Sequence, residues 1–202
     1  MSSPAPPRGP GRPREFDLDV ALDGAIVAFC ERGFHANSIT QLSEAMGVGT
    51  GSLYKAFPDK RGLFLAAVER YAALRGAQLD AVLDTVEGGR ERLRAALTFY
   101  AATPHDGDDR QGCLLVNAAT ESATFDTALA NRIRDCLSLT ESRLAGLIAE
   151  GQSDGSIDQT IDGPATARLM LCLIHGLRVV GQAGMPPIGV AALVDAAMRT
   201  LR

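Results

Sequence analysis

The chain has 202 residues, of which 46% are hydrophobic and 22% are charged, so it can bury the core of one domain, or of a small domain joined to a larger one. Its net charge of −4 does not by itself indicate a nucleic-acid binder, although a local positive face depends on where the charges lie. No apolar run approaches bilayer-spanning length and the first residues lack a signal peptide's apolar stretch, so we expect a cytoplasmic protein with no membrane partner.

The first 14 residues, MSSPAPPRGPGRPR, are rich in Pro, Gly and Ser and are predicted to form a disordered basic arm. They contain Arg8, Arg12 and Arg14 and no acidic residue. The Gly-Arg-Pro run resembles an AT-hook, whose arginines enter the negative potential of a narrow minor groove. We expect this arm to contact DNA; the alternative is a solvated tail.

Two helices are predicted next. Apolar residues at helical spacing follow Asp17, which is a suitable N-cap, and this first helix should end before Gly33. Ser38 and Gln41 have the spacing of a capping box, in which the two side chains satisfy each other's backbone amides. A short helix is therefore expected over 39–46.

Three glycines follow in the stretch GVGTGSLYKAF, residues 47–57. A phosphate-binding loop needs a preceding strand, whereas a helix is predicted here, and the spacing fits neither GxxxxGK[ST] nor GxGxxG. The remaining interpretation is a helix, a tight turn and a second helix over 50–57, with Gly47 at positive φ and with Gly49 and Gly51 allowing a close approach to a partner backbone.

A helix-turn-helix inserts its second helix into the DNA major groove, N-terminal end first. In that arrangement a small core holds the unit together, formed by Leu42, Ala45, Val48, Leu53 and Phe57. Thr50, Ser52 and Lys55 should point outward, and the Tyr54 hydroxyl and Lys60 should reach phosphates. The alternative is that these are ordinary surface residues of a small helical bundle.

The rest of the chain also has helical periodicity, and strong loop sequences separate its segments. Helices are predicted over 59–84, 89–103, 113–121, 125–151, 162–183 and 187–201. The intervening loops contain HDGDDRQG, SDGSID and GMPP. Because no segment alternates with period two, we predict an all-α fold without a sheet.

A family resemblance becomes specific over about residues 16–71. The segment FDLDVALDGAIVAFCERGFHANSITQLSEAMGVGTGSLYKAFPDKRGLFLAAV resembles the DNA-binding domain of TetR/AcrR-type transcriptional regulators. The matching features, in order, are Gly33-Phe34, Ser38-Ile39, Leu42, Ala45, Gly47-Val48, Gly51-Ser52-Leu53-Tyr54, Phe57, Lys60 and Leu63-Phe64.

The resemblance implies an all-helical homodimer without enzymatic activity, cofactor or metal. A three-helix DNA-binding domain over 15–60 would precede a ligand-binding and dimerisation domain over 61–202. The implied function is repression of transcription, with release from a near-palindromic operator by a small-molecule effector. Alternatives of other kinds are a thiol-based redox or electrophile sensor, a metal-responsive regulator, and a DNA-binding protein that senses nothing.

The expected DNA contacts combine the arm, the two short helices and the following helix. They are Arg8, Arg12, Arg14, Ser38, Thr40, Gly49, Thr50, Gly51, Ser52, Tyr54, Lys55 and Lys60. Ala56 departs from the His or Tyr that family members often carry there, which removes one usual phosphate contact. A single short, weakly basic helix would bind poorly, so two copies about 34–36 Å apart are expected to read the operator together.

The ligand site and the dimer interface are expected in the second domain. Asn117 and Glu121 lie four residues apart in an apolar helix and could orient a ligand, although polar residues on packed helices are often purely structural. The full set of candidate ligand contacts is Phe99, Tyr100, Asn117, Glu121, Met170 and His175. The long apolar faces of residues 162–201 predict the homodimer interface through a four-helix arrangement.

Cys113 supports the two sensing alternatives. It opens a predicted helix, whose dipole would favour a reactive thiolate, and it follows the acidic HDGDD stretch, which could hold a metal. The sequence has no GxSxG motif, no standard metal spacing and no phosphate loop, so an enzyme is not expected.

Overall fold

The computed structural model describes residues 17–102, 113–183 and 189–201, and within these ranges the chain forms helices and no strand. The α-helices are α1 (Leu18–Arg32), α2 (Ile39–Ala45), α3 (Thr50–Ala56), α4 (Lys60–Leu83), α5 (Gly89–Ala101), α6 (Leu114–Glu121), α7 (Thr127–Ser153), α8 (Gly163–Gln182) and α9 (Val190–Met198). Short 3-10 turns follow α6 (Ser122–Thr124) and α9 (Arg199–Leu201). The all-α prediction is confirmed, and none of the described helices is long and apolar enough to span a bilayer.

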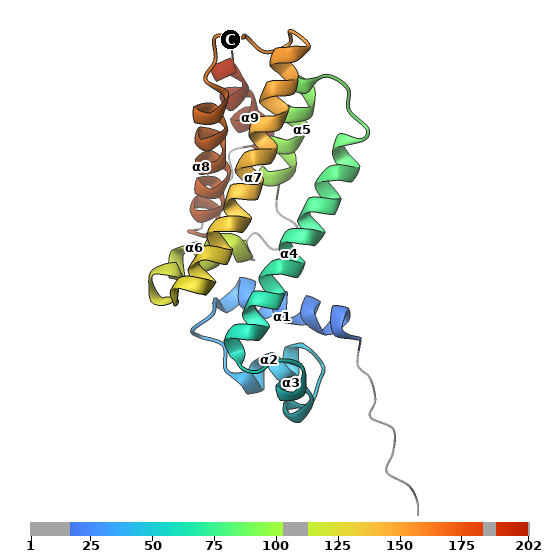
Figure 1. Cartoon of the computed structure of the whole chain (residues 1–202), viewed down its shortest axis with the longest axis vertical. Helices are drawn as coiled ribbons and strands as arrows, with labels where there is room; N and C mark the ends of the chain where they lie inside the picture. Colours follow the sequence, from blue (N-terminus) through green and yellow to red (C-terminus); the bar gives the residue numbers. More distant parts are fainter. Residues whose placement is uncertain (1–16, 103–112, 184–188, 202) are drawn as a thin grey trace, which may run out of the picture.

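Helices α1, α2 and α3 form one end of the molecule, and α4 runs from this end into a larger bundle of α5, α7, α8 and α9 (Figure 1). Helix α6 lies at the junction and contacts α1, α4, α7 and α8. The core of the small end is apolar, with Phe29 of α1, Leu42 of α2 and Leu53 of α3 fully buried against Phe64 of α4. This packing holds the two short helices, which could not be stable alone.

The local signals in the sequence determine where the first helices begin and how they turn. Asp17 caps α1, and Ser38 and Gln41 form the expected capping box at the start of α2. Gly47 has a φ of 65°, as the tight turn requires. One predicted core position differs: Ala45 is exposed and Met46 is buried in its place.

Ala45 is displaced because α1 and α2 touch through their backbones. A Cβ atom at Gly24 of α1 would overlap the carbonyl oxygen of Ala45, so only glycine allows this approach. The contact turns the Ala45 side chain outward and orients α2 against α1. The apolar pattern predicted that the Ala45 side chain would pack in the core, but the α2 backbone at Ala45 makes the contact with α1 instead.

Helix α4 contributes to two cores. Its first half, including Leu63 and Phe64, packs with α1, whereas Leu79 and Leu83 pack with α5, α7 and α8. The domain boundary expected between residues 60 and 61 falls at the first turn of this helix. One continuous helix thus connects the two ends of the molecule.

Candidate DNA-binding face and ligand pocket

Helix α3 buries one side and exposes the other. Leu53 is fully buried and Phe57, directly after the helix, is nearly so. Thr50, Gly51, Tyr54 and Lys55 are exposed, and more than half of the Tyr54 surface (54%) is accessible. Ser52 is half-buried, and a Cβ at Gly49 or Gly51 would meet no neighbouring atom. The predicted contact residues of α3 therefore share a side that is free to approach a partner.

Ser43 stabilises the turn before α3, and the sequence analysis missed it. Its hydroxyl donates to the carbonyl of Val48, whose amide donates back to the Ser43 carbonyl at 3.1 Å. The Thr50 hydroxyl donates to the hydroxyl oxygen of Ser43 at 3.4 Å. The signal in the sequence was a serine one helical turn before the glycine-rich turn. The structure shows that this serine is buried, and a buried hydroxyl must find a partner.

The other predicted DNA contacts have different surroundings. Thr40 and Ser38 are exposed, but the Ser38 hydroxyl already accepts the Gln41 amide at 3.2 Å. The Lys60 ammonium turns toward the α1–α2 connection, where it lies 4.6 Å from the Phe34 ring centroid and 3.4 Å from a carbonyl oxygen. Burial lowers the pKa of Lys60. Arg8, Arg12 and Arg14 lie outside the described residues.

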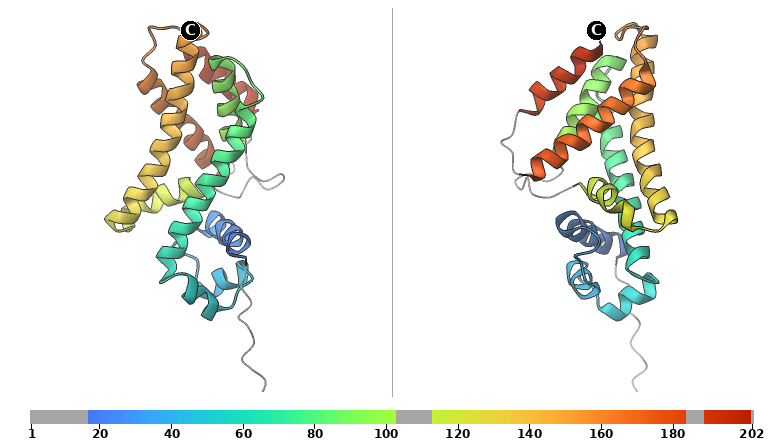
Figure 2. Two further views of the ribbon diagram at one scale, coloured as in Figure 1. Left: turned by 45° about the vertical axis from the view of Figure 1, so that its right-hand side comes forward. Right: turned by 90° about the vertical axis from the view of Figure 1, so that its left-hand side faces the viewer.

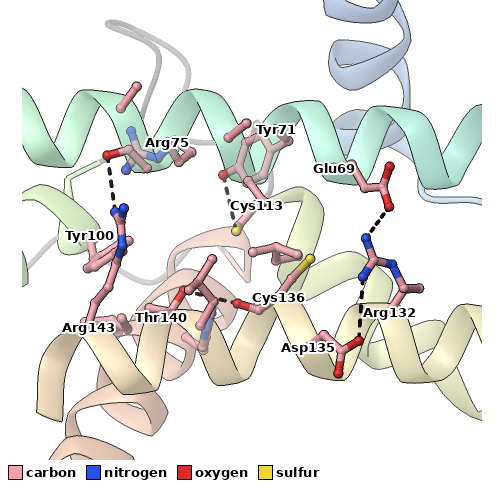
Figure 3. Close-up of a pocket in the computed structure, with 18 of the residues that line it drawn as sticks. Glu69, Tyr71, Arg75, Tyr100, Cys113, Arg132, Asp135, Cys136, Thr140 and Arg143 are labelled. Atoms are coloured by element: carbon pink, nitrogen blue, oxygen red, sulfur yellow. Dashed lines mark hydrogen bonds and ion pairs between the residues drawn. The ribbon is translucent and has the colours of Figure 1, made fainter. Parts of the chain in front are cut away.

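A cavity of about 550 Å³, partly open to solvent, lies between α4 and α7 and is bordered by residues of α5, α6 and α8. Figure 3 shows its α4 and α7 walls, with Tyr71 directed toward Cys113 on one side and Arg132 between Glu69 and Asp135. Its volume is in the range of pockets that enclose small molecules. Most of its lining surface is apolar, and its polar groups are concentrated in a few side chains.

The two α7 arginines of this pocket are already paired. Arg132 lies 2.5 Å from Glu69 and 3.8 Å from Asp135. Arg143 lies 3.1 Å from Asp80 of α4 and donates to the carbonyl of Gly76 at 3.2 Å. The Arg132–Glu69 and Arg143–Asp80 pairs join α7 to α4, so the charges of the two arginines are compensated without a ligand.

The predicted ligand contacts divide into two groups. Tyr100 and His175 line the pocket. Phe99 does not, but its ring lies 3.9 Å beneath the guanidinium of the pocket residue Arg75. Met170 is almost fully buried in the core of the larger bundle.

Asn117 and Glu121, expected to orient a ligand, do not line this pocket, because α6 turns them toward the small end. The Asn117 amide donates to the carbonyl of Cys30 at 2.8 Å. Glu121 accepts the backbone amide of Phe34 at 3.1 Å and that of His35 at 3.3 Å. The four-residue spacing correctly placed them on one face, but that face is the contact with α1 and the α1–α2 connection.

Cys113 is buried, lines the pocket and lies 3.4 Å from the Tyr71 hydroxyl. Burial, with a contribution from Cys113, raises the pKa of Cys30 to about 12, so Cys30 stays a thiol. No cluster able to hold a metal ion occurs among the described residues, and the HDGDDRQG stretch lies outside them.

Two family models match the chain. That for bacterial regulatory proteins of the tetR family covers residues 21–67, and that for the tetracyclin repressor-like C-terminal domain covers residues 89–184. The transcriptional repressor ComR from Escherichia coli (strain K12) is 30% identical over 177 residues, which is 86% of this chain and 83% of ComR. The chain belongs to the TetR family of transcriptional regulators.

Other TetR-family proteins support the same function. The repressor BdcR from Escherichia coli (strain K12) is 37% identical over 109 residues, which is 54% of this chain and 55% of BdcR. A cysteine mutant of the regulator CifR, solved with 26-bp operator DNA, is 31% identical, with a TM-score of 0.75 over 95% of this chain and all of that chain. This TetR-family chain is thus a DNA-binding transcriptional regulator, and its relatives are regulators and not enzymes.

TetR-family regulators act as dimers. Here α8 presents an outer apolar face, on which Leu169, Val179 and Val180 are exposed together with Cys172 and Gly176. Figure 2 shows α8 and α9 together at one side of the bundle. Part of the predicted interface packs within its own chain instead, because Ala197 and Leu201 are buried in the core of the larger bundle.

Proposed function

We propose that the chain is a cytoplasmic repressor that leaves its operator when a small molecule occupies the α4–α7 pocket. The observation that carries this proposal is the position of α6. Helix α6 contributes Cys113, at its N-cap, and Leu115 to the pocket, and Asn117 and Glu121 to the contact with α1 and the α1–α2 connection. One short helix therefore touches both the cavity and the DNA-binding end.

Ligand binding can release the DNA if the ligand and the DNA favour different arrangements of the contact between α6 and the α1–α2 connection. A molecule that moves α6 would shift the carboxylate of Glu121 relative to the amides of Phe34 and His35. Because α1 packs on α2 and α4, such a shift would change the orientation of both recognition helices in the dimer. Their separation would then no longer match one turn of DNA.

The proposed DNA contacts are the α3 residues together with their neighbours on either side. They are Gly49, Thr50, Gly51, Ser52, Tyr54 and Lys55, with Ser38 and Thr40 of the α2 start, Lys60, and the arm residues Arg8, Arg12 and Arg14. Contacts from a lysine to phosphate supply affinity, whereas Thr50 and Ser52 can reach base edges. Lys60 would have to leave the Phe34 ring to reach a phosphate.

Replacing Lys55 by Ala is expected to weaken operator binding about equally on matched and mismatched sequences. The side chain is exposed at the end of α3 and its role in this proposal is to neutralise a phosphate. The plot of log affinity against log salt should become less steep by about 1 per lost contact. Fluorescence anisotropy at several salt concentrations measures this. An unchanged slope would remove Lys55 from the DNA contacts.

A gel-shift and a reporter assay test the whole proposal. The purified chain should retard DNA flanking its own gene in a salt-sensitive manner, and deleting the gene should raise expression from that promoter. A chain that retards no promoter fragment would contradict the proposal. Retardation combined with lower expression after deletion would make the chain an activator.

A second candidate is a thiol-responsive repressor. It is favoured by one observation: Cys113 lies in the pocket wall, with its sulfur against the Tyr71 hydroxyl, where an electrophile bound in the cavity would meet it. Replacing Cys113 by Ser should abolish release by an oxidant or electrophile while leaving DNA binding intact. Release that persists in this variant would exclude Cys113 as the sensor.

A further inference from the structure

The part of the pocket formed by α8 contains a buried charge that pairs with no carboxylate of residues 17–102, 113–183 or 189–201. Arg178 is only 9% exposed. Its Nη2 atom donates to the carbonyl of Tyr100 at 3.0 Å and to that of Ala102, which fixes the guanidinium against the end of α5. Its Nη1 atom is buried and has no hydrogen-bond partner among the described residues. A buried donor on a charged group is costly when it is unsatisfied.

A second unsatisfied nitrogen lies one turn earlier on the same helix. The Nε2 atom of His175 is also buried, with no partner in the part of the chain that the structure describes, and His175 also lines the pocket. Burial lowers the pKa of His175, and the charge of Arg178 lowers it further, so the imidazole is neutral at pH 7 and can donate one hydrogen bond.

Arg75 of α4 adds a second positive charge. It donates to the carbonyl of Phe99 at 3.2 Å and to the side chain of Gln78 at 3.2 Å, both of which are neutral. Burial lowers the pKa of Arg75, and the nearby charge of Arg178 also lowers it. Arg75 and Arg178 donate to the carbonyls of consecutive α5 residues, Phe99 and Tyr100, so both guanidinium groups lie at the same end of α5, where their like charges repel each other. Neither forms an ion pair within the described part of the chain.

The arginines that α7 contributes to the pocket differ from Arg75 and Arg178 in their partners. Arg132 and Arg143 each have a carboxylate partner, whereas the acceptors of Arg75 and Arg178 among the described residues are all neutral. An anion is the group that would relieve the repulsion and satisfy the free donors together. Guanidinium donors match the geometry of a carboxylate particularly well.

We propose that the pocket binds an amphipathic organic acid, with its carboxylate held by Arg178 Nη1 and His175 Nε2 beside Arg75. The inference rests on the proposed function, because it names the ligand class of the same pocket. The apolar body of the acid would lie along small and aliphatic side chains of four helices. These are Ala72, Ala73, Ala77, Leu115, Leu139 and Ile174.

The test compares three probes of equal length on the full-length dimer: octanoate, octan-1-ol and octylammonium. Isothermal titration should give octanoate a dissociation constant at least about tenfold below that of octan-1-ol, since hydrogen bonds to charged groups are worth this much or more. Octylammonium should bind more weakly than octan-1-ol. Equal affinity of all three probes, or a preference for the ammonium, would overturn the assignment.

Two variants assign the preference to the named atoms. Replacing Arg178 by Gln should reduce the preference for octanoate over octan-1-ol to about twofold or less. Because Arg178 also holds the end of α5, His175→Phe provides a second variant that leaves those carbonyl contacts in place. It should reduce the preference by about three- to tenfold or more, because it removes one hydrogen bond to the carboxylate.

Arg168→Gln is the matched control, because it removes the same charge from α8 at a surface residue that pairs with Glu141 outside the pocket. It should keep the full octanoate preference. A preference that survives in both Arg178→Gln and His175→Phe would contradict the site. Operator binding separates this result from the proposed function: a dimer that binds operator DNA but not octanoate overturns only the ligand class.

Discussion

Replacing Gly176 by Arg should convert the dimer into a monomer and lower operator affinity by roughly a hundredfold or more. Gly176 lies in the middle of the exposed apolar face of α8, and a Cβ there would meet no atom of the described residues of its own chain. The protomer can therefore accommodate the arginine, whereas an interface between two α8 helices cannot. Each seven-residue α3 would then act alone and lose the gain from binding two half-sites together.

Size-exclusion chromatography with light scattering reports the assembly state, and anisotropy reports the operator affinity. Gly146→Arg is the matched control, because Gly146 of α7 is also exposed with open space around it. This control should remain dimeric and bind DNA normally. If Gly176→Arg stays dimeric, the interface does not lie on the α8 face.

Replacing Gly33 by Ala should destabilise the protein by about 2–4 kcal/mol and disturb the contact between α6 and the α1–α2 connection. Gly33 has φ 73° and ψ −174°, a region that is essentially reserved for glycine and costs other residues about 1–3 kcal/mol. A Cβ there would also overlap the carboxylate oxygen of Glu121. The displaced carboxylate would lose its hydrogen bonds to the amides of Phe34 and His35, which are worth about 1.5–3 kcal/mol when one partner is charged.

Urea unfolding of the purified variant measures this loss. Gly88→Ala separates the two causes, since Gly88 also combines a positive φ (81°) with an extended ψ (133°), but a Cβ there would meet only the Asp154 carboxylate at 3.9 Å, an ordinary contact. This variant should lower the free energy of unfolding clearly less than Gly33→Ala does. A free energy of unfolding for Gly33→Ala within about 0.5 kcal/mol of the parent would contradict the assigned contact, because that is the usual range for neutral surface changes.

The sequence predicted the features that depend on neighbouring residues. The capping box at Ser38, the N-cap Asp17 and the turn at Gly47 follow from local hydrogen bonding and backbone freedom, so they could be read directly. The helix starts and ends also agree to within a few residues.

The pocket could not be predicted in the same way, because it depends on how distant helices meet. Periodicity placed Asn117 and Glu121 on one face but could not say that α1, not a ligand, covers it. Arg75 and Arg178 are more than a hundred residues apart in the chain, and nothing local marks them as neighbours. Asn37 differs, because its partners are local: its buried amide donates to the carbonyls of Ala28 and Gly33, nine and four residues earlier, and stabilises the end of α1.

Hydroxyl-radical footprinting of the full-length dimer on the DNA flanking its own gene tests the central claim most directly. The account predicts two protected segments on one face of the duplex, about one helical turn apart, with each segment lost in the Gly176→Arg monomer. A single protected segment bound by the intact dimer, or no protection on any fragment, would contradict the insertion of two α3 helices into successive major grooves.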